Sequence, residues 1–128
     1  MAHDLGTSGN KATLFDASGR LVASTVYAYP TQYPQDRWVE QDPEDWWAAV
    51  CTSTKALLEK AAVDAGKVLC VSFSAQMMGC LLVDKNGMPL RNMITWADTR
   101  AQREEAEMVN QIGLERGYRI TGHRLSAS

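Results

Sequence analysis

The first part of the chain alternates short apolar stretches with turn-forming residues, a pattern that predicts a β-hairpin. Residues 11–15 have the composition of a strand, and residues 16–20 supply the Asp, Ser and Gly of a turn. Residues 21–29 carry β-branched and aromatic side chains and predict the returning strand. Residues 30–41 then form a polar and aromatic loop with two prolines.

The pattern changes at Asp42, where capping residues precede a helical stripe. Asp42 suits the N-cap, and Pro43 at the first helical position sacrifices no hydrogen bond. Side chains that share one face then recur at three- and four-residue steps: Trp47, Val50, Thr54, Leu57, Leu58 and Ala61. This spacing predicts an amphipathic helix of about five turns.

Three more strands are predicted in the second half of the chain. The nearly continuous apolar run 68–73 is typical of a strand covered on both faces. The run 80–83 and the segment 92–96 are predicted as strands. An Asn-Gly turn is predicted at residues 84–87, directly after the run 80–83.

A second helix is predicted to start near Asp98 or Thr99 and to end around Gly113. The tail 118–128 carries no predicted element. Because strands and helices are interspersed, the predicted class is α/β with a mixed sheet.

Composition excludes several functional classes without naming one. The 128 residues suit one domain, and 13 basic against 15 acidic side chains give no electrostatic reason to expect nucleic acid or an anionic membrane as partner. No apolar run approaches the roughly 20 residues that span a bilayer, and the N-terminus lacks the pattern of a signal peptide. The 3 cysteines have no CxxC spacing, which argues against disulfides or structural zinc and favours a reducing, cytoplasmic location.

A glycine-rich segment near the N-terminus combines a carboxylate, two hydroxyls and a cation. Its candidate phosphate-binding residues are Asp4, Gly6, Thr7, Ser8 and Lys11. Glycines let a backbone approach a phosphate, and hydroxyls can donate to its oxygens. Asp4 could hold Mg²⁺ through water, and Lys11 could neutralise phosphate charge. An ordinary surface turn is the other interpretation.

Two loops at strand ends carry the candidates for substrate binding, since open α/β sheets bind ligands there. In the first, Gln76 offers a donor and an acceptor to a polyol, while Met77 and Met78 offer an adaptable apolar wall or only fill a core. In the second, Trp96 could pack against the carbon face of a sugar. Asp98 could orient hydroxyls or the loop, and it also suits a helix N-cap.

Other polar and aromatic features have structural interpretations. Residues 38–43 suit an aromatic anchor followed by the helix cap. Arg100, like Asp98, could orient hydroxyls or the loop. His3 and His123 have no partners at metal-ligand spacing and receive no role.

Taken together, these segments resemble the FGGY carbohydrate kinases, which transfer the γ-phosphate of ATP to sugars and polyols. The matching blocks are residues 4–11, 38–47, 73–79, 94–100 and 120–122. The resemblance implies an actin-like, ribonuclease-H-like ATPase domain, with a mixed β-sheet flanked by helices. In this family two such domains close over ATP and sugar.

The resemblance also implies roles for the candidate residues. The glycine-rich segment matches the family's first phosphate-binding hairpin, with Asp4 near the magnesium, so ATP and Mg²⁺ are the implied cofactors. Gln76, Met77 and Met78 match the substrate loop. Trp96 matches an aromatic residue of the sugar pocket, with Asp98 in the same block.

Among subfamilies, the resemblance favours xylulose kinases and hence a pentulose such as D-xylulose. Xylulose kinases usually have His where this chain has Met78, and the Thr-Trp-Ala-Asp stretch is also similar to gluconate kinases. The alternatives are therefore another FGGY substrate, a pseudokinase, or a non-catalytic binding module on the same actin-like unit.

Family members are several times longer than this chain, and their catalytic base lies in a region that would follow Ser128. We therefore expect residues 1–128 to form an N-terminal, substrate-side domain, incomplete at both ends, without the C-terminal kinase domain and inactive alone. In relatives Asp4 ends an apolar first strand, of which this chain has Met1 to His3. The hairpin is thus expected to lack most of a neighbour and to self-associate, with a homo-oligomer as one outcome.

Overall fold

The computed structural model describes residues 1–127, which fall into two compact units. The first unit comprises Met1–Thr31 and Asp42–Met77. The second comprises Gln32–Gln41 and the described residues from Met78 onward.

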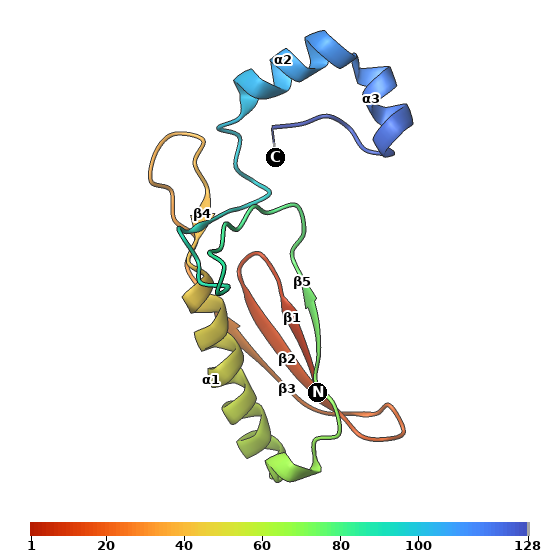
Figure 1. The fold of residues 1–128 in the computed structure, drawn as a ribbon. Coiled ribbons are helices and arrows are strands. Elements are labelled where there is room, and N and C mark those ends of the chain that lie inside the picture. The colour runs from red at the N-terminus through yellow and green to blue at the C-terminus, as the bar shows by residue number, and fades with distance from the viewer. Residues whose placement is uncertain (128) are drawn as a thin grey trace. The chain divides into compact units, whose positions relative to one another are not determined.

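The first unit is built on a four-stranded mixed sheet (Figure 1). Its strands are β1 (Ala2–Leu5), β2 (Gly9–Phe15), β3 (Leu21–Ala28) and β5 (Ser72–Ala75), in the order β3-β2-β1-β5. β2 pairs antiparallel with β1 and β3, whereas β1 and β5 run parallel. The predicted hairpin and the predicted mixed sheet are confirmed.

β1 is longer than the sequence led us to expect. It pairs with Asn10 through Thr13 of β2, so the expectation that the hairpin lacks most of a neighbour is wrong. The cause is that the strand does not stop at His3 but continues through Asp4 to Leu5 before the glycine-rich turn begins.

Helix α1 (Pro43–Ala61) begins as predicted. The Asp42 side chain accepts a hydrogen bond from the Glu44 backbone N–H at 2.9 Å. The helix packs on β2 and β3, and the apolar core of this unit consists of Ala12, Leu14, Ala23 and Leu57. Trp47, which the stripe included, is 64% exposed, so the buried face is narrower than predicted. A short 3-10 helix, η1 (Ala65–Lys67), follows.

A buried polar cluster also joins the helix to the sheet. The Asn10 amide Nδ2 donates to Ser53 Oγ at 2.7 Å and lies 3.0 Å from His3 Nδ1. Because an amide nitrogen only donates, His3 Nδ1 accepts, and the ring is neutral with its proton on Nε2, 3.3 Å from Thr54 Oγ1. The His3 ring also stacks on Phe73, with 5.2 Å between centroids. His3 thus has a structural place that the sequence did not indicate.

The apolar run 68–73 does not form the predicted covered strand. β5 begins only at Ser72, all its residues are exposed, and Leu69 before it is 93% exposed. The reason is its position, because β5 lies at the edge of the sheet beyond β1, while α1 packs over β2 and β3. Apolar composition alone does not distinguish a central from an edge strand.

The second unit contains a small antiparallel pair, β4 (Glu40–Gln41) with β6 (Met93–Ile94). β4 was expected to be loop, and β6 replaces the longer strand predicted at 92–96. The predicted strand 80–83 is wrong, since this run makes only isolated bridges from Cys80 and Val83. Its chain folds back at once through the 84–87 turn, which is confirmed by the Gly87 N–H bonding to the Asp84 carbonyl at 3.0 Å.

Helices α2 (Gln102–Ile112) and α3 (Leu114–Thr121) complete this unit. The predicted start at Asp98 or Thr99 is wrong: α2 is capped by Ala101 without a side-chain hydrogen bond. Its end at Gly113 is confirmed. α3 begins before the tail 118–128, which was predicted to carry no element, and runs into it as far as Thr121, so that prediction is wrong for residues 118–121. The i,i+4 pair of Glu115 with Arg119 favours this helix, and Ser128 of the tail lies outside the described residues. None of the helices described within residues 1–127 is long and apolar enough to cross a membrane.

Candidate functional site

The glycine-rich segment forms the tight turn between β1 and β2. The Gly6 N–H donates to the Gly9 carbonyl at 3.0 Å, which leaves Thr7 and Ser8 exposed at the tip. A Cβ on Gly9 would lie 2.8 Å from the Tyr27 carbonyl oxygen of β3, so only glycine fits there. Gly6 has no such constraint, because its nearest atom would lie at 3.5 Å.

Tyr29, at the end of β3, holds this turn in place. Its hydroxyl donates to the Gly6 carbonyl, and its backbone N–H donates to the Ser8 carbonyl at 3.3 Å. The side chain is buried, and burial, with a further contribution from the Asp4 charge, raises the pKa of its phenol. Sequence reasoning missed Tyr29 because it lies 23 residues from Gly6 and outside the motif.

Asp4 and Lys11 are brought together by strand register. Asp4 is the cross-strand neighbour of Lys11 on β2 and of Ser74 on β5. Ser74 Oγ donates to the Asp4 carboxylate at 2.8 Å. All three residues line a pocket of about 390 Å³ on β1, β2 and β5. The structure thus places an acidic and a basic residue at one open pocket. The Leu5–Asn10 pair separates them from the turn that carries Thr7 and Ser8, and neither of those two residues lines the pocket.

The donor set at this pocket fits Mg²⁺ held through water. Within residues 1–127 no three His, Cys, Asp or Glu side chains gather as a metal cage. Mg²⁺ keeps several of its waters and needs only one or two carboxylates together with phosphate oxygens. The exposed Asp4 carboxylate offers that arrangement, and Lys11, its cross-strand neighbour, lines the same pocket.

The predicted substrate loop begins where β5 ends. The Gln76 N–H donates to the Leu5 carbonyl at 2.8 Å, which places the Gln76 backbone next to the end of β1. Met77 is 77% exposed. Met78, the first residue of the second unit, is also exposed and has a left-handed backbone with φ of 63°. Filling of a core by these methionines, one of the two interpretations of their pattern, is therefore wrong.

In the second unit, Met78 lines a pocket of about 260 Å³. Other residues that line this pocket include Ile94, Asp98 and Arg100. A Cβ on Gly79, next to Met78, would lie 2.5 Å from the Met93 sulfur and 3.2 Å from the Ile94 carbonyl oxygen, so a side chain there would displace the end of Met93. The close packing of Gly79 on Met93 fixes the chain directly after the left-handed residue.

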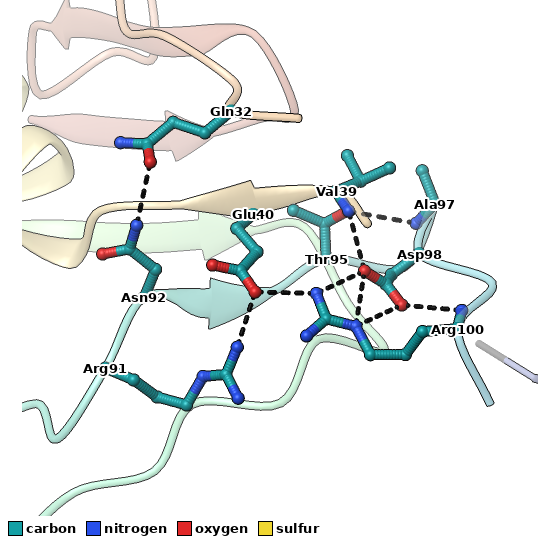
Figure 2. Close-up of polar contacts among 9 residues, drawn as sticks. All are labelled: Gln32, Val39, Glu40, Arg91, Asn92, Thr95, Ala97, Asp98 and Arg100. Carbon is teal, nitrogen blue, oxygen red and sulfur yellow. Dashed lines mark hydrogen bonds and ion pairs between the residues drawn. The ribbon is translucent and has the colours of Figure 1, made fainter. Parts of the chain in front are cut away.

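Buried opposite charges dominate the polar contacts of this unit (Figure 2). The Arg100 guanidinium binds both oxygens of the Asp98 carboxylate at 2.7–3.0 Å. It also donates to Glu40 Oε1 at 2.7 Å, and Arg91 donates to the same oxygen at 2.5 Å. Arg100 lies over the Trp38 ring, 3.8 Å from its centroid.

Asp98 is ionised and saturated with donors. Burial by itself raises its pKa, but hydrogen bonds from the Arg100 side chain and from the backbone N–H groups of Val39 and Arg100 outweigh burial. Together with the Arg100 charge they lower the pKa of Asp98 to about 2. In return, Asp98 raises the pKa of Arg100. Asp98 as a residue is only 1% exposed, and the hydrogen bonds of its carboxylate are made with Arg100 and with the Val39 backbone.

Trp96 stands at the corner of a turn over residues 95–98. The Asp98 N–H closes this turn on the Thr95 carbonyl at 3.1 Å, and Trp96 is 46% exposed. Trp96 and Asp98 are therefore held in one turn of the second unit. Gln76 and Met77 belong to the first unit.

Sequence reasoning missed the roles of Glu40 and Arg91. Glu40 lies 51 residues from Arg91 and 60 from Arg100, so no local period links them. Only the presence of Glu in an otherwise aromatic and apolar stretch, Trp38-Val39-Glu40, marked that position.

Comparisons with known proteins agree over nearly the whole chain. The model of the FGGY family of carbohydrate kinases, N-terminal domain, matches residues 1–127. A glycerol kinase from Chelativorans sp. (strain BNC1) is 36% identical over 116 residues, which are 90% of this chain and 23% of that protein. A xylulose kinase from Staphylococcus xylosus is 34% identical over 118 residues, 92% of this chain and 24% of that protein.

Solved structures give the same result. A protein described as a xyloylose kinase from Brucella ovis matches with a TM-score of 0.88 and 34% identity, over 98% of this chain and 26% of that one. A gluconate kinase from Lactobacillus acidophilus matches with a TM-score of 0.87 and 31% identity, over 97% and 25% respectively. The predicted actin-like α/β fold with a mixed sheet is confirmed. The chain spans about a quarter of the length of the relatives it matches.

Proposed function

Because this chain belongs to the FGGY family of carbohydrate kinases, as an N-terminal domain, we propose that it works within an enzyme that transfers the γ-phosphate of ATP to a hydroxyl of a sugar or polyol. The observation that carries this proposal is the placement of Asp4 and Lys11 as cross-strand neighbours at an open pocket. Phosphoryl transfer depends on positioning and charge compensation, and this pocket offers both.

Each hairpin residue has a role in the proposal. The hydroxyls of Thr7 and Ser8 and the nearby backbone donate to phosphate oxygens, and Gly6 leaves the space for a close approach. Lys11 neutralises phosphate charge. Asp4 holds Mg²⁺ through water, and when bound this ion offsets the charge that develops on the phosphates. Tyr29 and Gly9 fix the turn before the ligand arrives, which lowers the entropic cost of binding.

The sugar side of the proposal rests on Gln76, Met77, Met78, Trp96 and Asp98. A pentulose such as D-xylulose is our first substrate. Glycerol and gluconate are the competing substrates, because similar proteins carry those names. We further propose that the catalytic base and the adenosine-binding loops belong to a C-terminal kinase domain outside these 128 residues, that the 128-residue chain alone does not catalyse transfer, and that the enzyme works in the cytoplasm.

The test is an Asp4→Asn variant in the longest natural polypeptide that carries this sequence. ATP-dependent phosphorylation is measured with xylulose, glycerol and gluconate. We expect kcat to fall on the order of 10²-fold, as when one transition-state charge contact is lost, with the sugar KM unchanged.

Asp36→Asn is the matched control, because Asp36 has a 94% exposed side chain paired only with its neighbour Arg37 at 3.5 Å. Unchanged kcat in Asp4→Asn would remove Asp4 from the phosphate site. Absence of phosphorylation of all three substrates by the unmodified protein would favour the non-catalytic binding module instead.

A further inference from the structure

The turn that carries Trp96 is held at both ends by the backbone of one residue, Val39. The Thr95 N–H donates to the Val39 carbonyl at 3.0 Å, and the Asp98 carboxylate accepts from the Val39 N–H at 2.7 Å. These bonds flank the corner at Trp96 (Figure 2 shows the Asp98 side). The backbone from which the Trp96 side chain projects is therefore fixed by the two bonds to Val39.

Asp98 is itself held by Arg100, whose guanidinium is fixed by the two residues on either side of Val39. Trp38 lies against its flat face, and Glu40 accepts from its edge. Three consecutive residues therefore hold this part of the unit: Trp38 and Glu40 contact Arg100, and Val39 binds both ends of the turn. We call these three residues, together with Asp98 and Arg100, the Val39 clamp.

The clamp contains two carboxylates and one guanidinium, all largely removed from water, and Arg91 outside it supplies a second positive charge to Glu40. The side-chain exposures are 2% for Asp98, 8% for Glu40 and 17% for Arg100. A planar guanidinium can bind a carboxylate with two parallel bonds, stack on an indole and reach a second carboxylate, whereas an ammonium cannot do all three. The site therefore requires the shape of arginine as well as its charge.

We propose that Arg100 is a positioning residue that orients Trp96 for sugar binding, acting through Asp98 and the Val39 backbone. The role of Trp96 in sugar binding rests on the proposed function; the orientation of Trp96 by Arg100 does not. Arg100 touches neither phosphate nor sugar in this proposal. Its effect is on the direction of the indole.

Arg100→Lys tests this, because it keeps the positive charge and removes the planar fork. In the full polypeptide we expect the KM for the sugar to rise about fivefold or more, the change that a loss near 1 kcal/mol produces, with kcat and the KM for ATP unchanged. A merely structural effect would instead lower kcat through loss of folded enzyme. Arg103→Lys on α2 is the matched control, since Arg103 makes an exposed pair with Glu107 at 3.0 Å.

The second readout needs no substrate. The emission of Trp96 is obtained as the difference between each protein and its Trp96→Phe partner, and its quenching by acrylamide is measured. We expect Arg100→Lys to increase the quenching constant of Trp96 about twofold and Arg103→Lys to leave it unchanged. Unchanged quenching in a folded Arg100→Lys protein would overturn the proposal, and so would a lowered kcat with an unchanged sugar KM.

If circular dichroism shows that the Arg100→Lys protein is not folded, Trp38→Leu is used in its place. This change removes the aromatic face under Arg100 and leaves every ion pair of the clamp in place, so the same two shifts are expected in smaller size. Unchanged Trp96 quenching in Trp38→Leu then overturns the proposal. A parent protein that phosphorylates no sugar contradicts the proposed function alone, because the quenching experiment still decides whether Arg100 orients Trp96.

Discussion

Asp4 within β1 and Asp98 in the turn after β6 are both candidate site aspartates, yet they differ in exposure and in hydrogen-bond partners. Asp4 is exposed, accepts from the Ser74 hydroxyl and lies across from a lysine. Asp98 is 1% exposed and accepts hydrogen bonds from Arg100 and Val39. The sequence offered both as site residues on equal terms.

The difference shows which carboxylate is available to a ligand. An exposed carboxylate exchanges water for an incoming cation at small cost, whereas a buried, fully bonded one would first have to give up its partners. The hairpin pocket is therefore suited to bind, and the Val39 clamp is suited to hold a shape. That Asp98 itself touches the sugar stays a prediction.

The largest difference in stability between the two regions is expected when the arginine of the Val39 clamp is removed. Arg100→Met leaves the carboxylates of Asp98 and Glu40 buried beside an apolar side chain, and we expect about 3–5 kcal/mol of destabilisation. Asp4→Asn on the exposed surface should cost less than about 1 kcal/mol. Chemical denaturation of both variants, with Arg103→Met as control, measures these values. Equal losses for Arg100→Met and Asp4→Asn would contradict the distinction.

Within the hairpin, the two glycines offer a sharper contrast. Gly9→Ala drives a methyl group against the Tyr27 carbonyl, and we expect about 1–3 kcal/mol of destabilisation from overpacking. Gly6→Ala meets only ordinary contacts, so its effect on stability should stay within about 0.5 kcal/mol. Thermal or urea unfolding of the two variants measures their losses of stability. A larger loss in Gly6→Ala than in Gly9→Ala would mean that the close approach of Gly9 to the Tyr27 carbonyl does not constrain the turn.

Acid should affect the two regions in separate pH ranges. The pKa of Asp98 is about 2 in the folded chain against an ordinary 3.8, so its contribution of about 2 kcal/mol is present above pH 3.8 and is lost as pH falls through 2. Burial lowers the pKa of His3, next to Asp4, below its ordinary 6.5. The folded chain then resists a proton that the unfolded chain takes up, so stability declines as pH falls below 6.5.

Unfolding free energies measured from pH 8 to pH 2 test both ranges. Asp98→Asn should flatten the profile only below pH 4, and His3→Asn only below pH 6.5. If the decline of the unfolding free energy near pH 6 persists in His3→Asn, a titrating group other than His3 causes it.

Local rules predicted the parts of the fold that depend on near neighbours. The Asp42 cap, the start of α1 at Pro43 and the Asn-Gly turn at 84–87 all depend on contacts within a few residues. The helix over Leu114–Thr121 was missed because its pattern is short and its apolar content low. The edge position of β5 could not be predicted, since sheet order is set by pairing partners distant in the sequence.

The candidate site divides in the same way. Motif chemistry found Asp4, Thr7, Ser8 and Lys11 because they share one hairpin, and the register of β1 with β2 then brought Asp4 and Lys11 together. Tyr29, Glu40 and Arg91 could not be found, because each acts on a residue 23 to 60 positions away. Long-range polar contacts leave no periodic signal in one sequence.

The hydrogen bond from Tyr29 to the Gly6 carbonyl has an optical consequence. Its phenol is buried beside Asp4, so its ionisation depends on the charge at the mouth of the pocket. Burial is the larger cause of the raised pKa and the Asp4 charge the smaller one, so a cation arriving at Asp4 would lower the pKa of Tyr29 only by the part that Asp4 contributes. Because phenolate absorbs at longer ultraviolet wavelengths than phenol, an absorbance titration of Tyr29 reports the charge at Asp4 without any label.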